Sequence, residues 1–275
     1  MSLASIASLD RRWIFLAVGL LVTLPLAFGF HIAPVEPSPR ARGFFDAIEK
    51  LPEGSTVLLA GDYDPSTIAE NYPMHLAATR HLMRRNMKII ALALYPAGPP
   101  LTDQVLHLVG EEFGKKEGID YVNLGYKTGN ELVMSSMGSS IPRTFPVDRR
   151  GIAVTQIPVM KGIQNYEQFA LLVNVSAGFP GTKEWVQQVV SRYHLPMVAG
   201  VTAVSAPEYY PYLQSGQLLG LLGGMAGAAE YEKARNEAGD ATSGMDAQSM
   251  AHLFVAFCIL LGNFVQWTKS RRTGA

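Results

Sequence analysis

An apolar segment near the N-terminus, residues 13–30 (WIFLAVGLLVTLPLAFGF), constrains this chain more than any other stretch. It runs for eighteen residues without a charged side chain. A backbone in lipid has to satisfy its own hydrogen bonds, so an apolar run of this length predicts a membrane-spanning helix. A second apolar segment, residues 250–267, lies near the end of the 275-residue chain. We therefore expect a polar domain bracketed by two transmembrane helices, with the lipid bilayer as a partner.

The first apolar segment has a competing interpretation as a cleaved signal peptide. Arg11 and Arg12 precede it, as basic residues precede the apolar part of a signal peptide. However, signal peptides have an apolar core of about 7–15 residues and a small-residue cleavage motif, and no clean motif of that kind follows this longer run. These features favour an uncleaved anchor.

The basic residues outside the two segments predict how the chain is oriented. Lys269, Arg271 and Arg272 follow the second segment directly, while Arg11 and Arg12 precede the first. Basic flanks stay on the cytoplasmic side of a membrane. We expect a two-pass protein of the cell (cytoplasmic) membrane whose central domain is extracytoplasmic, with cytoplasmic tails at 1–12 and 268–275.

Composition excludes some classes of function. The chain has 23 basic and 23 acidic residues, so the basic face of a nucleic-acid-binding protein is not expected. Its single cysteine, Cys258, lies inside the second apolar segment. An intramolecular disulfide and a cysteine-based metal site are therefore both excluded.

The segment between the two spans alternates between strand-like and helix-like patterns. A proline-rich stalk at 31–42 is followed by a predicted α/β domain at 43–205. Short apolar runs alternate with helical segments of about 10–16 residues, which predicts a Rossmann-like, doubly wound parallel sheet with helices on both faces. The expected strands are 55–60, 88–95, 120–126, 171–175 and 196–203. Residues 141–168 interrupt this rhythm, and we interpret them as an excursion that contains a short strand at 152–156.

A glycine-rich segment at 206–237 follows the last expected strand. Glycines recur there at a spacing of four residues, which is typical of closely packed helices, although each glycine costs a helix about 1 kcal/mol relative to alanine. We expect a packing helix in one of three settings: against the sheet, between subunits, or in the membrane. A short polar linker at 238–249 then leads to the second span. The glycines expected at the packing face are Gly216, Gly220, Gly223, Gly224 and Gly227.

Polar residues follow each expected strand. Parallel sheets bind ligands at the carboxyl ends of their strands, so these residues define a candidate ligand-binding crevice. The residues assigned to it are Asp62, Asp64, Ser66, Thr67, Tyr126, Lys127, Thr128, Ser176 and Thr202.

The sequence LLAGDYDPST contains the sharpest local motif, an apolar strand that ends in D-x-D-x-S/T. It resembles the first motif of the haloacid-dehalogenase-like phosphatases. The resemblance implies that Asp62 is a nucleophile, that Asp64 is a general acid/base, and that both act with Mg²⁺. The acidic pair that this family carries after a late strand is missing here. Alternatively, both aspartates form a turn that caps the following helix, with Pro65 at its first position, or they contribute to a binding site.

No complete catalytic constellation accompanies these residues. The loop after the first strand lacks the glycines of a dinucleotide-binding fingerprint, and the chain has no Walker A or G-x-S-x-G motif. We therefore expect a non-enzymatic scaffold or ligand-binding subunit of a larger membrane assembly, which self-associates and contacts other membrane subunits. The alternative is a metal-dependent hydrolase that uses Asp62 and Asp64, and only this alternative requires a cofactor, Mg²⁺.

Overall fold

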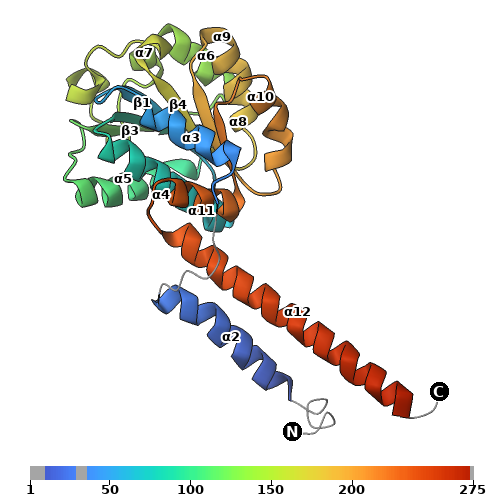
Figure 1. Ribbon diagram of the computed structural model, residues 1–275. Coiled ribbons are helices and arrows are strands. Elements are labelled where there is room, and N and C mark those ends of the chain that lie inside the picture. The colour runs from blue at the N-terminus through green and yellow to red at the C-terminus, as the bar shows by residue number, and fades with distance from the viewer. Residues whose placement is uncertain (1–9, 29–35, 273–275) are drawn as a thin grey trace. The chain divides into compact units, whose positions relative to one another are not determined.

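A six-stranded parallel sheet forms the centre of the described structure, a computed structural model that covers residues 10–28 and 36–272 (Figure 1). The strand order is β3-β2-β1-β4-β5-β6, and every neighbouring pair is parallel. The predicted α/β fold is therefore confirmed. The strands are β1 (Thr56–Asp62), β2 (Lys88–Ala93), β3 (Tyr121–Tyr126), β4 (Leu171–Ser176), β5 (Met197–Val201) and β6 (Gly220–Gly223).

Helices cover both faces of this sheet, as Figure 1 shows. One face carries α3 (Pro39–Glu49), α4 (Ile68–Arg84), α5 (Gly98–Phe113) and α11 (Gly224–Ala234). The other carries α6 (Glu131–Ser139), α7 (Ile141–Thr144), α8 (Thr182–Trp185), the π-helical turn Val186–Val190, α9 (Ser191–Tyr193) and α10 (Tyr210–Gln214). Short 3₁₀ turns lie at Pro65–Thr67, Val154–Gln156, Pro158–Met160, Tyr166–Gln168 and Ala206–Tyr209.

Alternation along β1 determines which side chains face which helical layer. Successive side chains of a strand point to opposite faces of the sheet. Leu58 and Ala60 are fully buried in the core cluster that contains Trp185 of α8, whereas Leu59 is buried outside that cluster. Asp62 continues the row of Leu58 and Ala60, so its side chain enters the same layer as Trp185.

Two predicted boundaries and one predicted strand were wrong. Ser38 caps the N-terminus of α3, whose first residue is Pro39, so the end of the predicted stalk is helical, while residues 31–35 lie outside the described residues. The expected strand at 152–156 is instead a 3₁₀ turn beside an isolated Val147–Ala153 bridge. The predicted linker at 238–249 is mostly helical, because α12 begins at Asp240.

Only the second half of the glycine-rich segment forms a packing helix, α11, which lies against α3 and α4 within the domain, while the first half does not. Gly220–Gly223 forms β6, which extends the sheet beyond the predicted limit at residue 205, and Gly224 begins α11. The cause is a close approach between α3 and β6. An added Cβ at Gly220 would lie 2.0 Å from the Phe44 backbone nitrogen, and one at Gly43 would lie 2.3 Å from the Leu219 carbonyl oxygen. A larger residue at Gly220 would therefore disturb the domain itself.

The remaining glycines of the segment also act within the domain. Gly216 lies in a turn with φ +75°, a conformation that favours glycine. An added Cβ at Gly227 would lie 2.9 Å from the Leu222 backbone, and one at Gly223 would lie 2.8 Å from the Ala206 side chain. The spacing of four residues thus reflects turns and close contacts inside one domain, where the sequence pattern suggested a single helical face.

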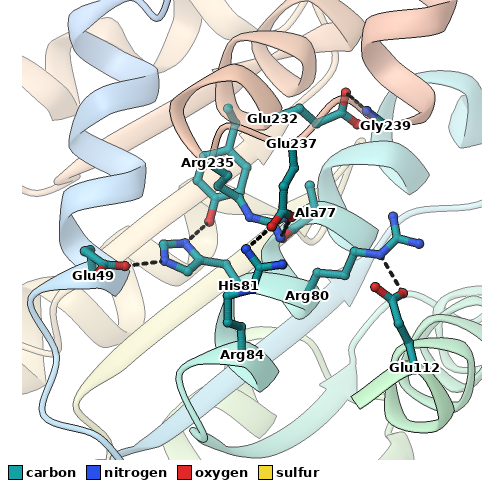
Figure 2. A network of polar contacts seen from close by, with 11 residues as sticks. Glu49, Ala77, Arg80, His81, Arg84, Glu112, Glu232, Arg235, Glu237 and Gly239 are labelled. Atoms are coloured by element: carbon teal, nitrogen blue, oxygen red, sulfur yellow. Dashed lines mark hydrogen bonds and ion pairs between the residues drawn. The ribbon is translucent and has the colours of Figure 1, made fainter. Parts of the chain in front are cut away.

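A buried polar network connects α3, α4 and α11 (Figure 2). His81 of α4 lies between Tyr231, whose hydroxyl is 2.6 Å from Nδ1, and Glu49, whose carboxylate is 2.9 Å from Nε2. Burial lowers the pKa of His81 to about 4, so the neutral ring accepts from Tyr231 and donates to Glu49. Arg235, the C-cap residue of α11, donates to the Ala77 carbonyl at 2.8 Å.

The same network reaches the first residues of α12. Glu232 of α11 accepts hydrogen bonds from the backbone nitrogens of Gly239 at 3.0 Å and Ala241 at 3.1 Å. These bonds satisfy backbone donors around the start of a helix, which otherwise lack intrahelical partners. These bonds lie within the α/β unit, Val35–Ala241, and join α11 to the last residues of that unit.

A separate unit contains two helices that are long and apolar enough to cross a membrane. These are α2 (Arg11–Phe28) and α12 (Asp240–Arg272), and each contains an 18-residue window with a mean hydropathy of 1.6. Only 6 % of either window is buried, unlike the core helix of a soluble domain. The Thr23 hydroxyl in α2 donates to the Gly19 carbonyl at 2.8 Å, so this polar group is satisfied within its own helix.

Candidate functional site

The order of the strands identifies where a ligand crevice is expected. The chain first adds strands on one side of β1 and then crosses to add β4, β5 and β6 on the other, so the connections reverse between β1 and β4. In open parallel sheets, ligands bind outside the carboxyl ends of the strands at such a switch point. β1 ends at Asp62 and β4 ends at Ser176, and these two residues are register partners.

Asp62 is fully used by hydrogen bonds within the protein. It is 0 % exposed. One carboxylate oxygen accepts the backbone N–H of Leu94 at 2.6 Å, and the other accepts Trp185 Nε1–H at 2.7 Å and Asn174 Nδ2–H at 3.0 Å. Burial raises the pKa of Asp62 to about 6, although these hydrogen bonds oppose the increase. The carboxylate thus joins β1, the loop after β2, β4 and α8.

The network around Asp62 continues along β4. Asn174 Oδ1 accepts from the Thr182 hydroxyl at 2.7 Å, and the Ser176 hydroxyl lies 2.9 Å from the Thr182 hydroxyl. All three residues are buried. Because hydrogen-bonded side chains fill the layer beneath the switch point, Asp62 and Ser176 are structural residues in this geometry.

Asp64 has a different environment from Asp62. It is the N-cap of the 3₁₀ turn Pro65–Thr67, and one carboxylate oxygen accepts both the backbone N–H and the hydroxyl of Ser66, at 2.7 and 2.6 Å. The other accepts from the Tyr95 hydroxyl at 3.1 Å. The hydrogen bonds from Ser66 lower the pKa of Asp64. The contacts therefore match the capping turn for Asp64, with Pro65 at the first position of the 3₁₀ turn, but not for Asp62, which takes no part in it.

The two aspartates do not converge on one ligand. The buried Asp62 carboxylate faces Trp185, whereas Asp64 binds the surface residues Ser66 and Tyr95. Within the part of the chain that the structure describes, no three His, Cys, Asp or Glu side chains gather into a set that could hold a metal ion. Among the described residues, Asp62 and Asp64 are therefore not arranged as the nucleophile and acid/base pair that the phosphatase resemblance implies.

The other predicted hydroxyl residues are engaged locally. Thr67 donates to the Asp64 carbonyl at 3.2 Å. Thr202 pairs with the Ser205 hydroxyl at 2.8 Å. Ala203, next to Thr202, donates its backbone N–H to Glu70 of α4 at 2.7 Å. These contacts brace the loops after β1 and β5.

A second set of buried polar groups lies on the opposite face of β1. His75 of α4 forms a hydrogen bond with Tyr63, in which Nδ1 lies 3.0 Å from the tyrosine hydroxyl. Burial lowers the pKa of His75 to about 3. An added Cβ at Gly61 would lie 2.3 Å from the Thr102 hydroxyl of α5 and 3.2 Å from the His75 ring. His75 Nε2 and the Thr102 hydroxyl have no hydrogen-bond partner among the described residues.

The open part of the predicted crevice lies at the edge strand β3. Lys127 and Thr128 follow β3 and line a cavity of about 740 Å³, together with the first turn of α6 and the segment that contains α7. Lys127 also lines a neighbouring cavity of about 510 Å³, where Tyr126 joins it. The remaining lining residues of the larger cavity are Gly129, Leu132, Val133, Ser136, Ser139, Ser140, Arg143, Thr144 and Gln164.

The structure thus separates the predicted crevice into a closed part and an open part. Asp62 and Ser176 belong to the closed network, and Lys127 and Thr128 belong to the open cavity. The sequence interpretation missed Arg143, which lies in the excursion at 141–168, where no periodic pattern predicted a position relative to the sheet. It also missed Asn174 and Trp185, although the alternation along β4 could have placed Asn174 on the same face as Ser176.

Comparison with known proteins adds no functional assignment to this geometry. The comparisons found no protein-family model and no curated protein that matches the chain.

Proposed function

We propose that this protein is a two-pass protein of the cell membrane, whose α/β domain lies outside the cytoplasm and serves as a non-catalytic binding or scaffold subunit of a membrane assembly. The observation that carries the non-catalytic part is the engagement of Asp62. At the switch point, where this topology usually places a ligand, three internal hydrogen bonds occupy the only carboxylate that ends β1.

The membrane location is supported by the exposed apolar side chains of α2 and α12. Trp13 and Phe15 of α2 are 63 % and 68 % exposed, and Leu253 and Leu260 of α12 are 66 % and 69 % exposed. Exposed apolar surface of this extent marks a membrane or protein interaction site. The signal-peptide interpretation applies only to α2, near the N-terminus. It does not explain the exposed apolar surface of α12, which follows the domain in the sequence.

Cysteine labelling tests the proposed orientation. In a Cys258→Ser background, Thr155→Cys places a thiol on the exposed turn Val154–Gln156 of the domain, and Ala275→Cys places one at the end of the chain. We expect a membrane-impermeant maleimide to label Thr155→Cys in intact cells, and to label Ala275→Cys only after the cells are opened. The reverse pattern would place the domain in the cytoplasm.

Native mass tests the proposed assembly. We expect the full chain to remain in the membrane fraction after a high-salt wash and to be extracted by mild detergent. The mass of the extracted particle, corrected for bound detergent, is expected to exceed that of one chain. A particle containing a single chain and no other protein would contradict the assembly, whereas release by salt alone would contradict the membrane anchoring.

A further inference from the structure

We infer that the 740 Å³ cavity beyond β3 binds a small molecule that carries a phosphate or carboxylate group. Lys127 approaches this cavity from the end of β3, and Arg143 approaches it from α7. The volume lies within the range of about 300–1,000 Å³ that is usual for small-molecule sites. This inference rests on the proposed binding role and names the class of ligand for it. It does not depend on the orientation of the protein in the membrane.

The charges that line the cavity are all positive. No aspartate or glutamate lines it. Nearby arginines behave differently, since Arg149 is paired with Asp103 and Arg150 with Glu117. Lys127 and Arg143, in contrast, form no ion pair with any residue that the structure describes. Two cations without an ion-pair partner at one cavity favour an anionic ligand over a cation or a neutral molecule.

The hydrogen-bonding groups in the cavity suit an oxyanion. A guanidinium binds phosphate or carboxylate through two parallel N–H donors, and a lysine adds a point charge. The hydroxyls of Thr128 and Ser139 have no hydrogen-bond partner in the described part of the chain, so they remain able to donate to a ligand. Leu132 and Val133 add an apolar wall, which suits an organic anion better than a hydrated inorganic ion.

The backbone beside the cavity is strained. Asn130, the N-cap of α6, has φ +45° and ψ −114°, a combination that normally requires glycine. It follows Gly129, whose φ is +126°. Strained conformations gather at ligand-binding sites, where the surrounding structure holds them in place. This observation supports the cavity as a binding site, although the charges and volume carry the inference.

Equilibrium dialysis of the detergent-solubilised full chain tests this inference, with inorganic phosphate in one arm and citrate in the other. We expect saturable binding at millimolar concentrations in at least one arm, and the arm that binds identifies the chemical class. Lys127→Gln and Arg143→Gln are each expected to weaken binding by about tenfold or more, because each removes a charged hydrogen-bond donor.

Lys161→Gln serves as the matched control. Lys161 is exposed, lies outside the cavity lining and undergoes the same change of charge. We expect this variant to bind like the wild type, and circular dichroism should show that all three variants remain folded. Three results would each overturn the inference. They are the absence of binding in both arms, wild-type binding by both Lys127→Gln and Arg143→Gln, and a loss of binding in Lys161→Gln as large as the loss in the two cavity variants. In none of these cases would the membrane labelling pattern change, so failure here is distinguishable from failure of the proposed topology.

Discussion

Replacing Asp62 by asparagine is expected to destabilise the α/β domain by about 2 kcal/mol, because at least one buried hydrogen-bond donor is left without its acceptor. The Asp62 carboxylate accepts three hydrogen bonds, from Leu94, Asn174 and Trp185. An asparagine has one acceptor oxygen, and its amide would place two donors against groups that also donate. At least one buried donor would therefore lose its acceptor, which costs more than the loss of a typical hydrogen bond.

Trp185 provides the measurement for this variant. The chain has three tryptophans, and replacing Trp13 and Trp267 by phenylalanine leaves Trp185, which is fully buried and donates to Asp62, as the only indole reporter. Denaturant unfolding of the full chain in detergent, followed by Trp185 fluorescence, should show the loss of stability directly.

Asp64→Asn is the matched control for the Asp62 variant. Asp64 caps a short turn near the surface, so its replacement by another good capping residue is expected to change stability by less than about 1 kcal/mol. A phosphatase-like site predicts a different pattern, in which both substitutions leave the fold intact and abolish turnover. If Asp62→Asn were as stable as the wild type, the structural role assigned to Asp62 would be wrong.

The sheet could be predicted from the sequence because its strands are short apolar runs bounded by clear breaks. β1, β2 and β4 are buried from both sides, so near-continuous apolar segments mark them. β6 carries no such mark. Its four residues, Gly220–Gly223, include two glycines. Gly220 is needed because the backbone of Phe44, which is distant in sequence, leaves no room for a side chain there. A tertiary contact of this kind leaves only a spacing in the sequence, and that spacing resembled a helix-packing motif.

The candidate site was predictable to the extent that strand ends indicate position. Lys127 and Thr128 could be assigned to the carboxyl edge because they follow β3 directly. Whether a residue there faces solvent or the interior depends on the face of the strand and on the helix above it. Asp62 and Asp64 show this dependence, since two positions along the chain separate a fully buried carboxylate from one near the surface. Arg143 reaches the cavity from a segment without regular periodicity, which the sequence pattern could not place.

Acidification is expected to destabilise the domain by about 3 kcal/mol between pH 7.5 and pH 5, and two buried histidines account for the direction. Burial lowers the pKa of His75 to about 3 and that of His81 to about 4, whereas both have pKa values near 6.5 in an unfolded chain. The unfolded state therefore binds more protons below pH 6.5, and stability falls as the pH falls. At pH 5 the two histidines together contribute a loss of about 4 kcal/mol.

Asp62 opposes this loss because its folded pKa, about 6, lies above its unfolded value of 3.8. Its contribution is fully present below pH 3.8 and is lost as the pH rises through 6. Between pH 7.5 and pH 5, Asp62 therefore raises the free energy of unfolding by about 1 kcal/mol. Together with the loss from the two histidines, this gives a net loss of about 3 kcal/mol.

The number of protons taken up on unfolding gives the sharpest test of this pH dependence. We expect His75→Gln and His81→Gln each to lower the uptake near pH 5 by about one proton, measured from the slope of unfolding free energy against pH. The slope is informative even where a substitution changes overall stability through lost hydrogen bonds, because that loss is largely independent of pH. His107→Gln, at an exposed position on α5 beside Glu111, is the matched control for the substitution itself. A wild-type slope in both buried-histidine variants would show that other groups cause the sensitivity to acid, whereas a reduced slope in these two alone would establish that the fold holds His75 and His81 neutral.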